Sequence, residues 1–319
     1  MKKKVLVTGS AGFLGSYLVQ HHLSNGDIVY GIDNFSSSSK RSKHHLRLIE
    51  NKNYYFLEGD ICSSSFVDRS KRFDIDLIYN FACPASPPKY QDIPIETTLT
   101  CTTGVNNVLS IARKSAVVVH ASTSEIYGDP EISPQPESYR GRVNSYGPRS
   151  CYDEGKRAAE ALCYDYKNKL RKDVRPVRIF NTYGPHMDIK DGRVITNFVD
   201  QALRGESLTV YGDGSQTRSF CYVTDLIRAI TSLANLTDNP GTPINIGNPT
   251  EFTIMELAEK LQKKFNCNIN FLPLPVDDPL QRRPDISLAK KLLSWEPKIE
   301  LDEGLEKTIQ HFRIEKYLK

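Results

Sequence analysis

Val5-Leu6-Val7-Thr8-Gly9-Ser10-Ala11-Gly12-Phe13-Leu14-Gly15 is the stretch that decides the fold of this chain. An apolar run leads into a Gly-x-x-Gly-x-x-Gly loop, and a helical stretch over 13–25 follows it. Gly9 permits a tight turn out of a strand, Gly12 lets the backbone approach a phosphate, and Gly15 permits close packing of helix on sheet. The free N–H groups of a helix N-terminus attract a pyrophosphate. The sequence therefore predicts a dinucleotide-binding loop.

The first half of the chain alternates β-rich runs with amphipathic stretches, which is typical of a parallel sheet covered on both faces. The runs predicted as strands are rich in β-branched and aromatic residues and lie at 5–8, 28–33, 54–57, 77–81, 117–120 and 174–180. After residue 180, Gly and Pro become frequent. We predict an α/β fold with a Rossmann-type doubly wound parallel sheet over 1–180, to which a helix near 225–235 returns, and a smaller C-terminal substrate-binding lobe over 181–319.

Asp33 indicates which dinucleotide binds. It ends the second predicted strand, at about the distance from the glycine loop where a carboxylate accepts hydrogen bonds from the adenosine ribose. The same carboxylate would repel a 2′-phosphate. We therefore expect NAD as the cofactor, in preference to NADP.

Tyr152 and Lys156 stand four residues apart in a predicted helix, so their side chains share one face. A free tyrosine has a pKa near 10 and is a poor base at neutral pH. A neighbouring ammonium and an oxidised nicotinamide ring both favour the phenolate, so we expect the pKa to fall toward the working range. The alternative is an ordinary surface Tyr–Lys pair. With the dinucleotide loop upstream, the pair predicts oxidation of a secondary alcohol.

The stretch 120–128 ends a predicted strand, and doubly wound sheets place their chemistry at strand carboxyl ends. Thr123 is positioned to hydrogen bond to a reacting hydroxyl, with Ser124 and Glu125 facing a sugar ring. The alternative for Ser and Thr after a strand is a helix cap.

In the second half of the chain, three arginines are candidate anion-binding residues, because guanidinium groups suit phosphate and carboxylate. They are Arg193, Arg218 and Arg282.

Composition narrows the class of protein. A net charge of +4 over 319 residues gives no argument for nucleic acid or a membrane surface, and no apolar run has the length of a membrane span. The seven cysteines are odd in number and include no Cys-x-x-Cys pair, which favours reduced thiols and a cytoplasmic location. The histidines show no metal-binding pattern, so we expect no metal.

These residues resemble the extended short-chain dehydrogenases/reductases that act on nucleotide sugars. The segments 84–90, 121–130, 147–157, 181–185, 191–194 and 208–212, together with 277–279 and 282–286, are similar to those of UDP-glucuronate decarboxylases. The resemblance covers nearly the whole chain in order. It implies an NAD-dependent conversion of UDP-glucuronate to UDP-xylose through a 4-keto intermediate, in a cytoplasmic homodimer that pairs through helices near 103–114 and 152–170.

The resemblance also implies residue roles. The catalytic set it implies is Thr123, Ser124, Glu125, Tyr152, Lys156 and Arg282. The implied NAD-binding set is Gly9, Gly12, Phe13, Leu14, Gly15, Asp33, Asn34, Asp60, Ile61, Ala82, Tyr152 and Lys156. The implied set for the UDP-sugar is Pro87, Tyr90, Glu125, Arg149, Asn181, Arg193, Val210, Tyr211, Arg218 and Arg282.

Ser124 discriminates among related activities. Sugar 4,6-dehydratases of this superfamily carry an Asp there as the acid for water loss, and a serine cannot replace it. Epimerases usually lack the glutamate at 125. Cys101 stands where such enzymes usually place an Asn that supports the tyrosine's proton relay, and Asn80 and Cys83 replace an expected His and Ser. These departures leave open release of the 4-keto pentose, an epimerase or an apiose-synthase-type reaction; a non-catalytic NAD sensor is disfavoured because Tyr152 and Lys156 are intact.

Overall fold

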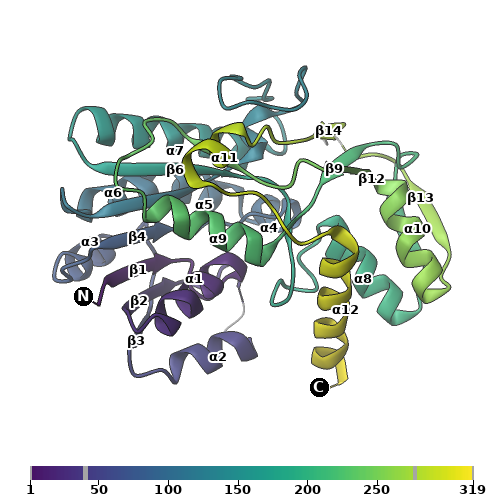
Figure 1. The fold of residues 1–319 in the computed structure, drawn as a ribbon, viewed down its shortest axis with the longest axis horizontal. Helices are drawn as coiled ribbons and strands as arrows, with labels where there is room; N and C mark the ends of the chain where they lie inside the picture. The colour runs from purple at the N-terminus through teal and green to yellow at the C-terminus, as the bar shows by residue number, and fades with distance from the viewer. Residues whose placement is uncertain (1, 39–41, 276–278, 318–319) are drawn as a thin grey trace.

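A sheet of seven parallel strands forms the centre of the molecule (Figure 1). The computed structural model describes residues 2–38, 42–275 and 279–317. The strand order is β3-β2-β1-β4-β5-β6-β11. The strands are β1 (Lys4–Thr8), β2 (Ile28–Asp33), β3 (Tyr54–Glu58), β4 (Leu77–Asn80), β5 (Val117–Thr123), β6 (Asp173–Ile179) and β11 (Ile244–Ile246). The order reverses beside β1, which makes its carboxyl end a ligand-binding position. The predicted doubly wound fold is confirmed.

Helices cover both faces of this sheet. One face carries α1 (Phe13–Ser24), α2 (Lys43–Ile49), α9 (Val223–Ala234) and α11 (Ser287–Leu293), and the other α3 (Ser64–Ser70), α6 (Val105–Ile111) and α7 (Ser150–Asn168). Successive side chains of a strand point to opposite faces. Accordingly Val5 and Val7 pack in the core under α1 and α9, whereas Leu6 packs in the core under α6 and α7. Burial on both faces explains the continuous apolar runs.

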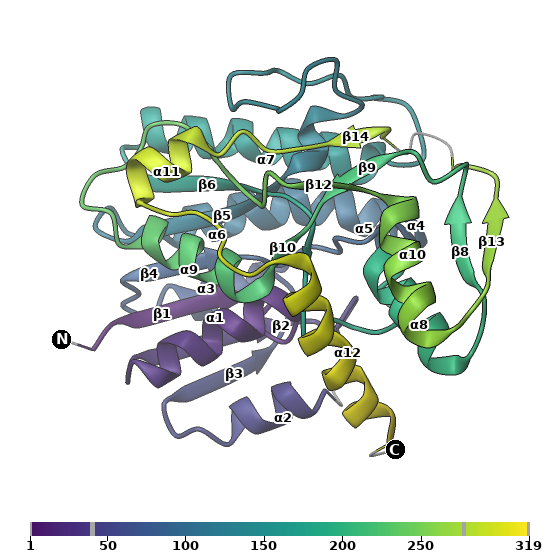
Figure 2. The same cartoon turned by 45° about the vertical axis from the view of Figure 1, so that its right-hand side comes forward.

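A smaller group of elements lies beside the carboxyl edge of the sheet, and both views separate it from the strands (Figure 2). It contains α8 (Val194–Arg204), α10 (Ile254–Phe265), α12 (Leu301–Tyr317) and the parallel pair β8 (Leu208–Tyr211) and β13 (Ile269–Leu272). Short strands connect it to the sheet: β7 (Thr182–Tyr183) with β10 (Cys221–Tyr222), and β9 (Thr217–Ser219) with β12 (Glu251–Thr253) and β14 (Gln281–Arg282). The division at residue 180 stays a prediction; α9 and β11 pack with the sheet.

The remaining elements follow the strand ends. They are α4 (Pro87–Asp92), α5 (Pro94–Leu99), the π-helical turn η1 (Thr100–Gly104) and the 3₁₀ turn η2 (Ser124–Tyr127). A π turn inside a helix widens it by one residue and is frequently found at functional sites. Of the segment 277–279, which resembles the decarboxylases, residues 277 and 278 lie outside the described residues. Among the described residues, no helix has the length and apolar character needed to cross a membrane.

Candidate active site

A cleft of about 990 Å³ is lined both by residues at the carboxyl edge of the sheet and by residues of the smaller group of elements. Its lining includes the glycine loop, the end of β5, the first turns of α7 and the start of α8. This volume lies at the upper end of what small-molecule sites occupy, so the cleft has room for a large ligand or for two ligands side by side.

The glycine loop has the geometry that its sequence predicts. Gly9 has φ +70°, and a Cβ there would lie 2.8 Å from the carbonyl oxygen of Phe81. A Cβ on Gly15 would overlap the carbonyl of Gly9, so α1 can begin this close to β1 only with glycine. Gly12 caps α1 without a side-chain hydrogen bond, which leaves N–H groups at the helix start for a phosphate.

A small recess of about 70 Å³ adjoins the glycine loop, and its lining includes the residues expected on the adenosine side of NAD. Asp33, Asn34, Asp60, Ile61 and Ala82 all line it. The Asp33 carboxylate accepts hydrogen bonds from Ala11 N at 3.0 Å, Phe35 N at 2.8 Å and Ser38 Oγ at 2.9 Å. A carboxylate offers about four acceptor positions, so it retains capacity for a ribose hydroxyl. The donors and acceptors present therefore fit a dinucleotide.

Tyr152, Lys156, Thr123, Cys83 and Cys101 form what we call the proton cluster. The Tyr152 ring stacks on Tyr90 with centroids 4.9 Å apart and planes 3° apart. Lys156 Nζ donates to the Ala121 carbonyl at 2.8 Å and lies 5.7 Å from the Tyr152 ring centroid. All except Cys101 line the cleft. A phenol, a hydroxyl and an ammonium thus converge at the end of β5.

The expected fall in the pKa of Tyr152 includes the effect of the oxidised nicotinamide, so it stays a prediction. In the protein alone, burial raises the pKa of Tyr152 well above its ordinary value, and the neighbouring Cys83 raises it further, while a hydrogen bond with Thr123 opposes them. The Lys156 ammonium donates to the Ala121 carbonyl and is not among the groups with the largest effect on the Tyr152 phenol. Sequence spacing places Lys156 near Tyr152 but does not show this other partner.

Glu125, Arg149, Arg218, Arg282 and Asp153 form what we call the charge cluster. Glu125 Oε2 accepts from Arg149 Nη2 at 2.7 Å and from Arg282 Nη2 at 3.3 Å. Burial raises the pKa of Glu125, but Arg282, Arg149 and Arg218 outweigh it and hold the pKa at about 2. The Glu125 carboxylate is therefore a permanent anion at the cleft wall.

Asp153 is the acidic member that motif analysis missed. Burial and then the negative charge of Glu125 raise the pKa of Asp153 to about 8, against the opposing effect of Arg149. Its Oδ1 has no hydrogen-bond partner among the described residues. Asp153 follows Tyr152 directly in the helix, which is the only sequence sign of its position. Two carboxyl groups of one cluster thus hold opposite protonation states at neutral pH.

Arg282 lies behind Glu125 and does not line the cleft. Its side chain is 1% exposed and donates to the carbonyl oxygens of Ser124 and Gly128 as well as to Glu125. Its Nε has no partner among the described residues. Direct contact between Arg282 and a substrate stays a prediction; the structure shows it fixing the turn that carries Ser124 and Glu125.

The other predicted substrate residues divide into two groups. Those that line the cleft are Pro87, Tyr90, Arg149, Asn181, Arg193, Tyr211 and Arg218. Arg193 pairs with Asp191 through Nε–Oδ1 at 2.5 Å and Nη2–Oδ2 at 2.9 Å. Val210, on β8, is fully buried in the core and contributes no cleft surface. In a strand, Tyr211 points to the opposite face from Val210, which explains why only one of the two neighbours borders the cleft.

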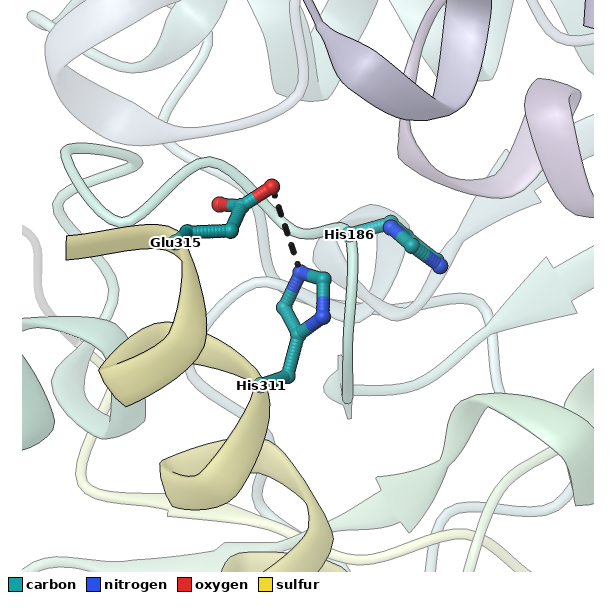
Figure 3. A group of neighbouring side chains, drawn as sticks. All are labelled: His186, His311 and Glu315. Carbon is teal, nitrogen blue, oxygen red and sulfur yellow. Dashed lines mark ion pairs between the residues drawn. The ribbon is translucent and has the colours of Figure 1, made fainter. Parts of the chain in front are cut away.

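A histidine cluster at the rim of the cleft escaped motif analysis (Figure 3). His186 and Glu315 border the cleft, and His311 lies one helical turn before Glu315 on α12, with Nε2–Oε1 at 3.5 Å. The ligand atoms of the three residues lie within 4.8 Å of one another. Burial lowers the pKa of His186 to about 3, and its ring stacks on His44 at 3.9 Å. The expectation of no metal stays a prediction.

Comparison with known proteins agrees with this geometry. Residues 5–247 match the model of the NAD dependent epimerase/dehydratase family. The chain is 48% identical over 317 residues to UDP-glucuronic acid decarboxylase 1 of Danio rerio, covering 98% of this chain and 73% of that protein. It is 48% identical to UDP-glucuronic acid decarboxylase 2 of Arabidopsis thaliana, over 97% of this chain and 68% of that one.

Solved structures show the same arrangement. UDP-glucuronic acid 4-epimerase of Bacillus cereus, solved in complex with UDP-glucuronic acid and NAD, superposes with a TM-score of 0.87 at 29% sequence identity. The match covers 98% of this chain and 99% of that chain.

Proposed function

Since the chain belongs to the NAD dependent epimerase/dehydratase family, we propose that it is a UDP-glucuronic acid decarboxylase that forms UDP-xylose and regenerates NAD. The identities to curated decarboxylases confirm the resemblance drawn from the motifs. The observation that carries the proposal is that one cleft joins the glycine loop, the proton cluster and an arginine-held Glu125. This combination supplies a redox site and a carboxylate-recognition site next to each other.

NAD bound at the glycine loop supplies a reversible two-electron oxidation at C4 of the sugar. The residues of the chain manage protons around that step. Tyr152 is the base that accepts the C4 hydroxyl proton, Thr123 hydrogen bonds to the same oxygen, and Lys156 supplies positive charge below them. The stacked Tyr90 ring holds the Tyr152 phenol in place on one side. The raised pKa of Tyr152 in the protein alone means that the phenolate needs the positively charged nicotinamide nearby.

The charge cluster governs loss of CO2. A ketone at C4 makes the uronic acid a β-keto acid, so the C5–carboxylate bond breaks with its electrons passing into an enolate. Glu125 holds the sugar ring, and Arg282 fixes the turn that carries Glu125 and assists in handling the carboxylate. Ser124 offers no acid group for water loss, which argues against a dehydratase. Arg218 and Arg193 bind the UDP phosphates, and Asn181 contacts the sugar.

Release of the 4-keto pentose is the second candidate outcome. Cys83 and Cys101 lie beside Lys156 where relatives in the resemblance carry Ser and Asn. A thiol is a weaker hydrogen-bond donor than an amide or a hydroxyl. Replacement of Ser and Asn by Cys83 and Cys101 should therefore slow the return of the proton to the O4 oxygen more than any other step. Formation of the keto intermediate and loss of CO2 depend on the other residues.

The wider organisation is part of the proposal. Residues 1–180 bind NAD and 181–319 the UDP-sugar. A homodimer forms through the helices near 103–114 and 152–170, which include α6 and α7. The 67% exposed Tyr164 ring on α7 supports this pairing, because a partner subunit would cover it. All seven cysteines are free, which supports a reducing, cytoplasmic setting.

The test incubates the purified protein with UDP-glucuronate and catalytic NAD, followed by proton NMR of the sugar and by CO2 release. CO2 with UDP-xylose and no net NADH is the expected result. CO2 with accumulating NADH and a 4-keto pentose would keep the decarboxylation and change the product. Absence of CO2, with UDP-galacturonate formed, would replace the proposal by an epimerase.

A further inference from the structure

Two thiols meet at the floor of the active-site cleft. Cys83 lies in the loop after β4 and lines the cleft, and Cys101 lies on the π turn η1 and is 1% exposed. Their sulfur atoms are 3.5 Å apart. A disulfide needs about 2.05 Å between sulfurs, so the two atoms must approach by about 1.5 Å, a movement within reach of side-chain rotation. The pair joins two segments that flank the NAD site.

Cys83 has the surroundings of a reactive thiol. Its sulfur lies 3.5 Å from the sulfur of Cys101, and it is close enough to Lys156 to feel the positive charge of the ammonium. The Cys101 bond lowers the pKa of Cys83, burial opposes it, and Lys156 lowers it again, to about 7. Thiols that react with oxidants are thiolates near a cation, reachable from solvent and next to a second cysteine. Buried Cys163 and Cys221 have pKa values raised by burial and meet none of these conditions.

Cys101 is packed against the helix that carries the catalytic pair. A Cβ added to Gly155 would lie 3.0 Å from Cys101 Cβ and 3.3 Å from its sulfur. Gly155 directly precedes Lys156, so a shift of Cys101 toward Cys83 loosens the packing behind the turn between Tyr152 and Lys156. Conversion of Cys83 to a disulfide also removes the sulfur anion that Lys156 contacts.

We propose that Cys83 and Cys101 are an oxidation site at which a hydroperoxide forms a reversible disulfide that switches off Lys156 and Tyr152. The inference rests on the proposed function. The disulfide would make the enzyme responsive to the redox state of its compartment, and intracellular disulfides usually have such a role.

The chemistry balances with the peroxide as oxidant. The Cys83 thiolate attacks one peroxide oxygen, breaks the O–O bond and becomes a sulfenic acid, while the other oxygen leaves as water after taking a proton. The Cys101 sulfur then attacks the Cys83 sulfur, loses its proton and expels a second water. The two sulfurs together lose two electrons, and the peroxide gains them. A dithiol reductant reverses the bond by thiol–disulfide exchange.

The test treats the reduced, NAD-loaded protein with hydrogen peroxide and measures CO2 release before treatment, after it, and after dithiothreitol. We expect a loss of about a hundredfold, in the range that proton-transfer groups contribute, and recovery with the reductant. Peptide mass spectrometry of the treated protein is expected to find a Cys83–Cys101 cross-link. Cys267→Ser removes a partly exposed thiol outside the cleft and is expected to respond as the unaltered protein does.

Variants at the pair separate the roles of the two sulfurs, each compared with its own untreated rate. Cys83→Ser is expected to resist peroxide, and Cys101→Ser to form no cross-link but to accumulate a sulfenic acid at Cys83 that a dimedone probe labels. Inactivation of Cys83→Ser as fast as the unaltered protein, or inactivation without the cross-link, would overturn the inference. The cross-link needs no substrate: a protein that forms it but releases no CO2 before treatment would refute the proposed function and leave the oxidation site standing.

Discussion

The proton cluster and the charge cluster share one cleft but are built on different principles. The proton cluster sets the Lys156 ammonium among phenols, thiols and a hydroxyl, and this ammonium donates a hydrogen bond to a backbone carbonyl. The charge cluster holds three guanidinium groups around one ionised carboxylate and one protonated acid, which leaves a net charge of +2 (three positive charges and one negative). The first cluster is suited to moving a proton, whereas the second is suited to attracting an anionic ligand.

The two clusters also differ in how the chain assembles them. The proton cluster takes its members from the first half of the chain: the loop after β4, η1, the end of β5 and the first turns of α7. The charge cluster joins residues 125 and 149–153 of that half to residues 218 and 282, which lie on β9 and β14. Because its buried ion pairs hold these segments together, substitutions in the charge cluster should affect both rate and stability, whereas substitutions in the proton cluster should mainly affect rate.

Tyr152→Phe gives the largest expected effect and tests the proton cluster. The ring and its stacking on Tyr90 remain, but the proton-accepting oxygen is lost. We expect CO2 release to fall roughly a thousandfold, within the range for a general base, while the midpoint of urea unfolding stays nearly unchanged. Tyr146→Phe, six residues before Tyr152 and 97% exposed, is the matched control and should keep full activity. If Tyr152→Phe unfolds at a much lower urea concentration, the proton cluster also contributes to stability, and the proposed difference between the two clusters is wrong.

Glu125→Gln tests the charge cluster. The amide keeps the shape but removes the anion, so Arg149 and Arg282 are left buried without their shared counter-charge. Breaking a buried ion pair typically costs 3–5 kcal/mol, and the partial exposure of Glu125 favours the lower end, about 3 kcal/mol of unfolding free energy. CO2 release should fall as well, because the same carboxylate lines the cleft and is proposed to hold the sugar ring.

The control for Glu125→Gln is Glu131→Gln. Glu131 pairs with Arg142 at 3.1 Å, but both side chains are about two-thirds exposed, at 65% and 69%. An exposed pair contributes less than about 1 kcal/mol. Urea unfolding of the two variants should therefore differ by a clear margin. Equal losses of unfolding free energy in the two variants would mean that the buried Glu125 ion pairs stabilise the protein no more than an ordinary surface pair does.

The sequence predicts the proton cluster better than the charge cluster. The pattern of apolar residues and the spacing of the glycines predict that β1 leads into the glycine loop and then into α1. Tyr152 and Lys156 stand four residues apart in one helix, so they share a helix face regardless of the rest of the fold. Burial of Arg282 behind Glu125 depends on β14 pairing with β9, which no local pattern encodes. The raised pKa of Asp153 likewise arises from burial and from Glu125, 28 positions away along the chain. Sequence motifs thus identify the residues of the site, but they do not show which charged side chains pair or shift one another's pKa.

Asp153→Asn tests the balance of charge in the charge cluster through the pH dependence of stability. Asp153 has a pKa of about 8 in the folded protein, against about 3.9 for an unfolded aspartate. Between these values the folded state holds a proton that the unfolded state has lost, so the contribution of Asp153 to stability is complete below about pH 3.9 and declines as pH rises through about 8. Asparagine cannot titrate, and it resembles the protonated acid. Unfolding by urea at about pH 5, 7 and 9 should therefore show a flatter decline in stability for Asp153→Asn than for the unaltered protein, with the two curves converging at low pH. If both curves decline in parallel, Asp153 is ionised in the folded state and the charge cluster carries a second anion.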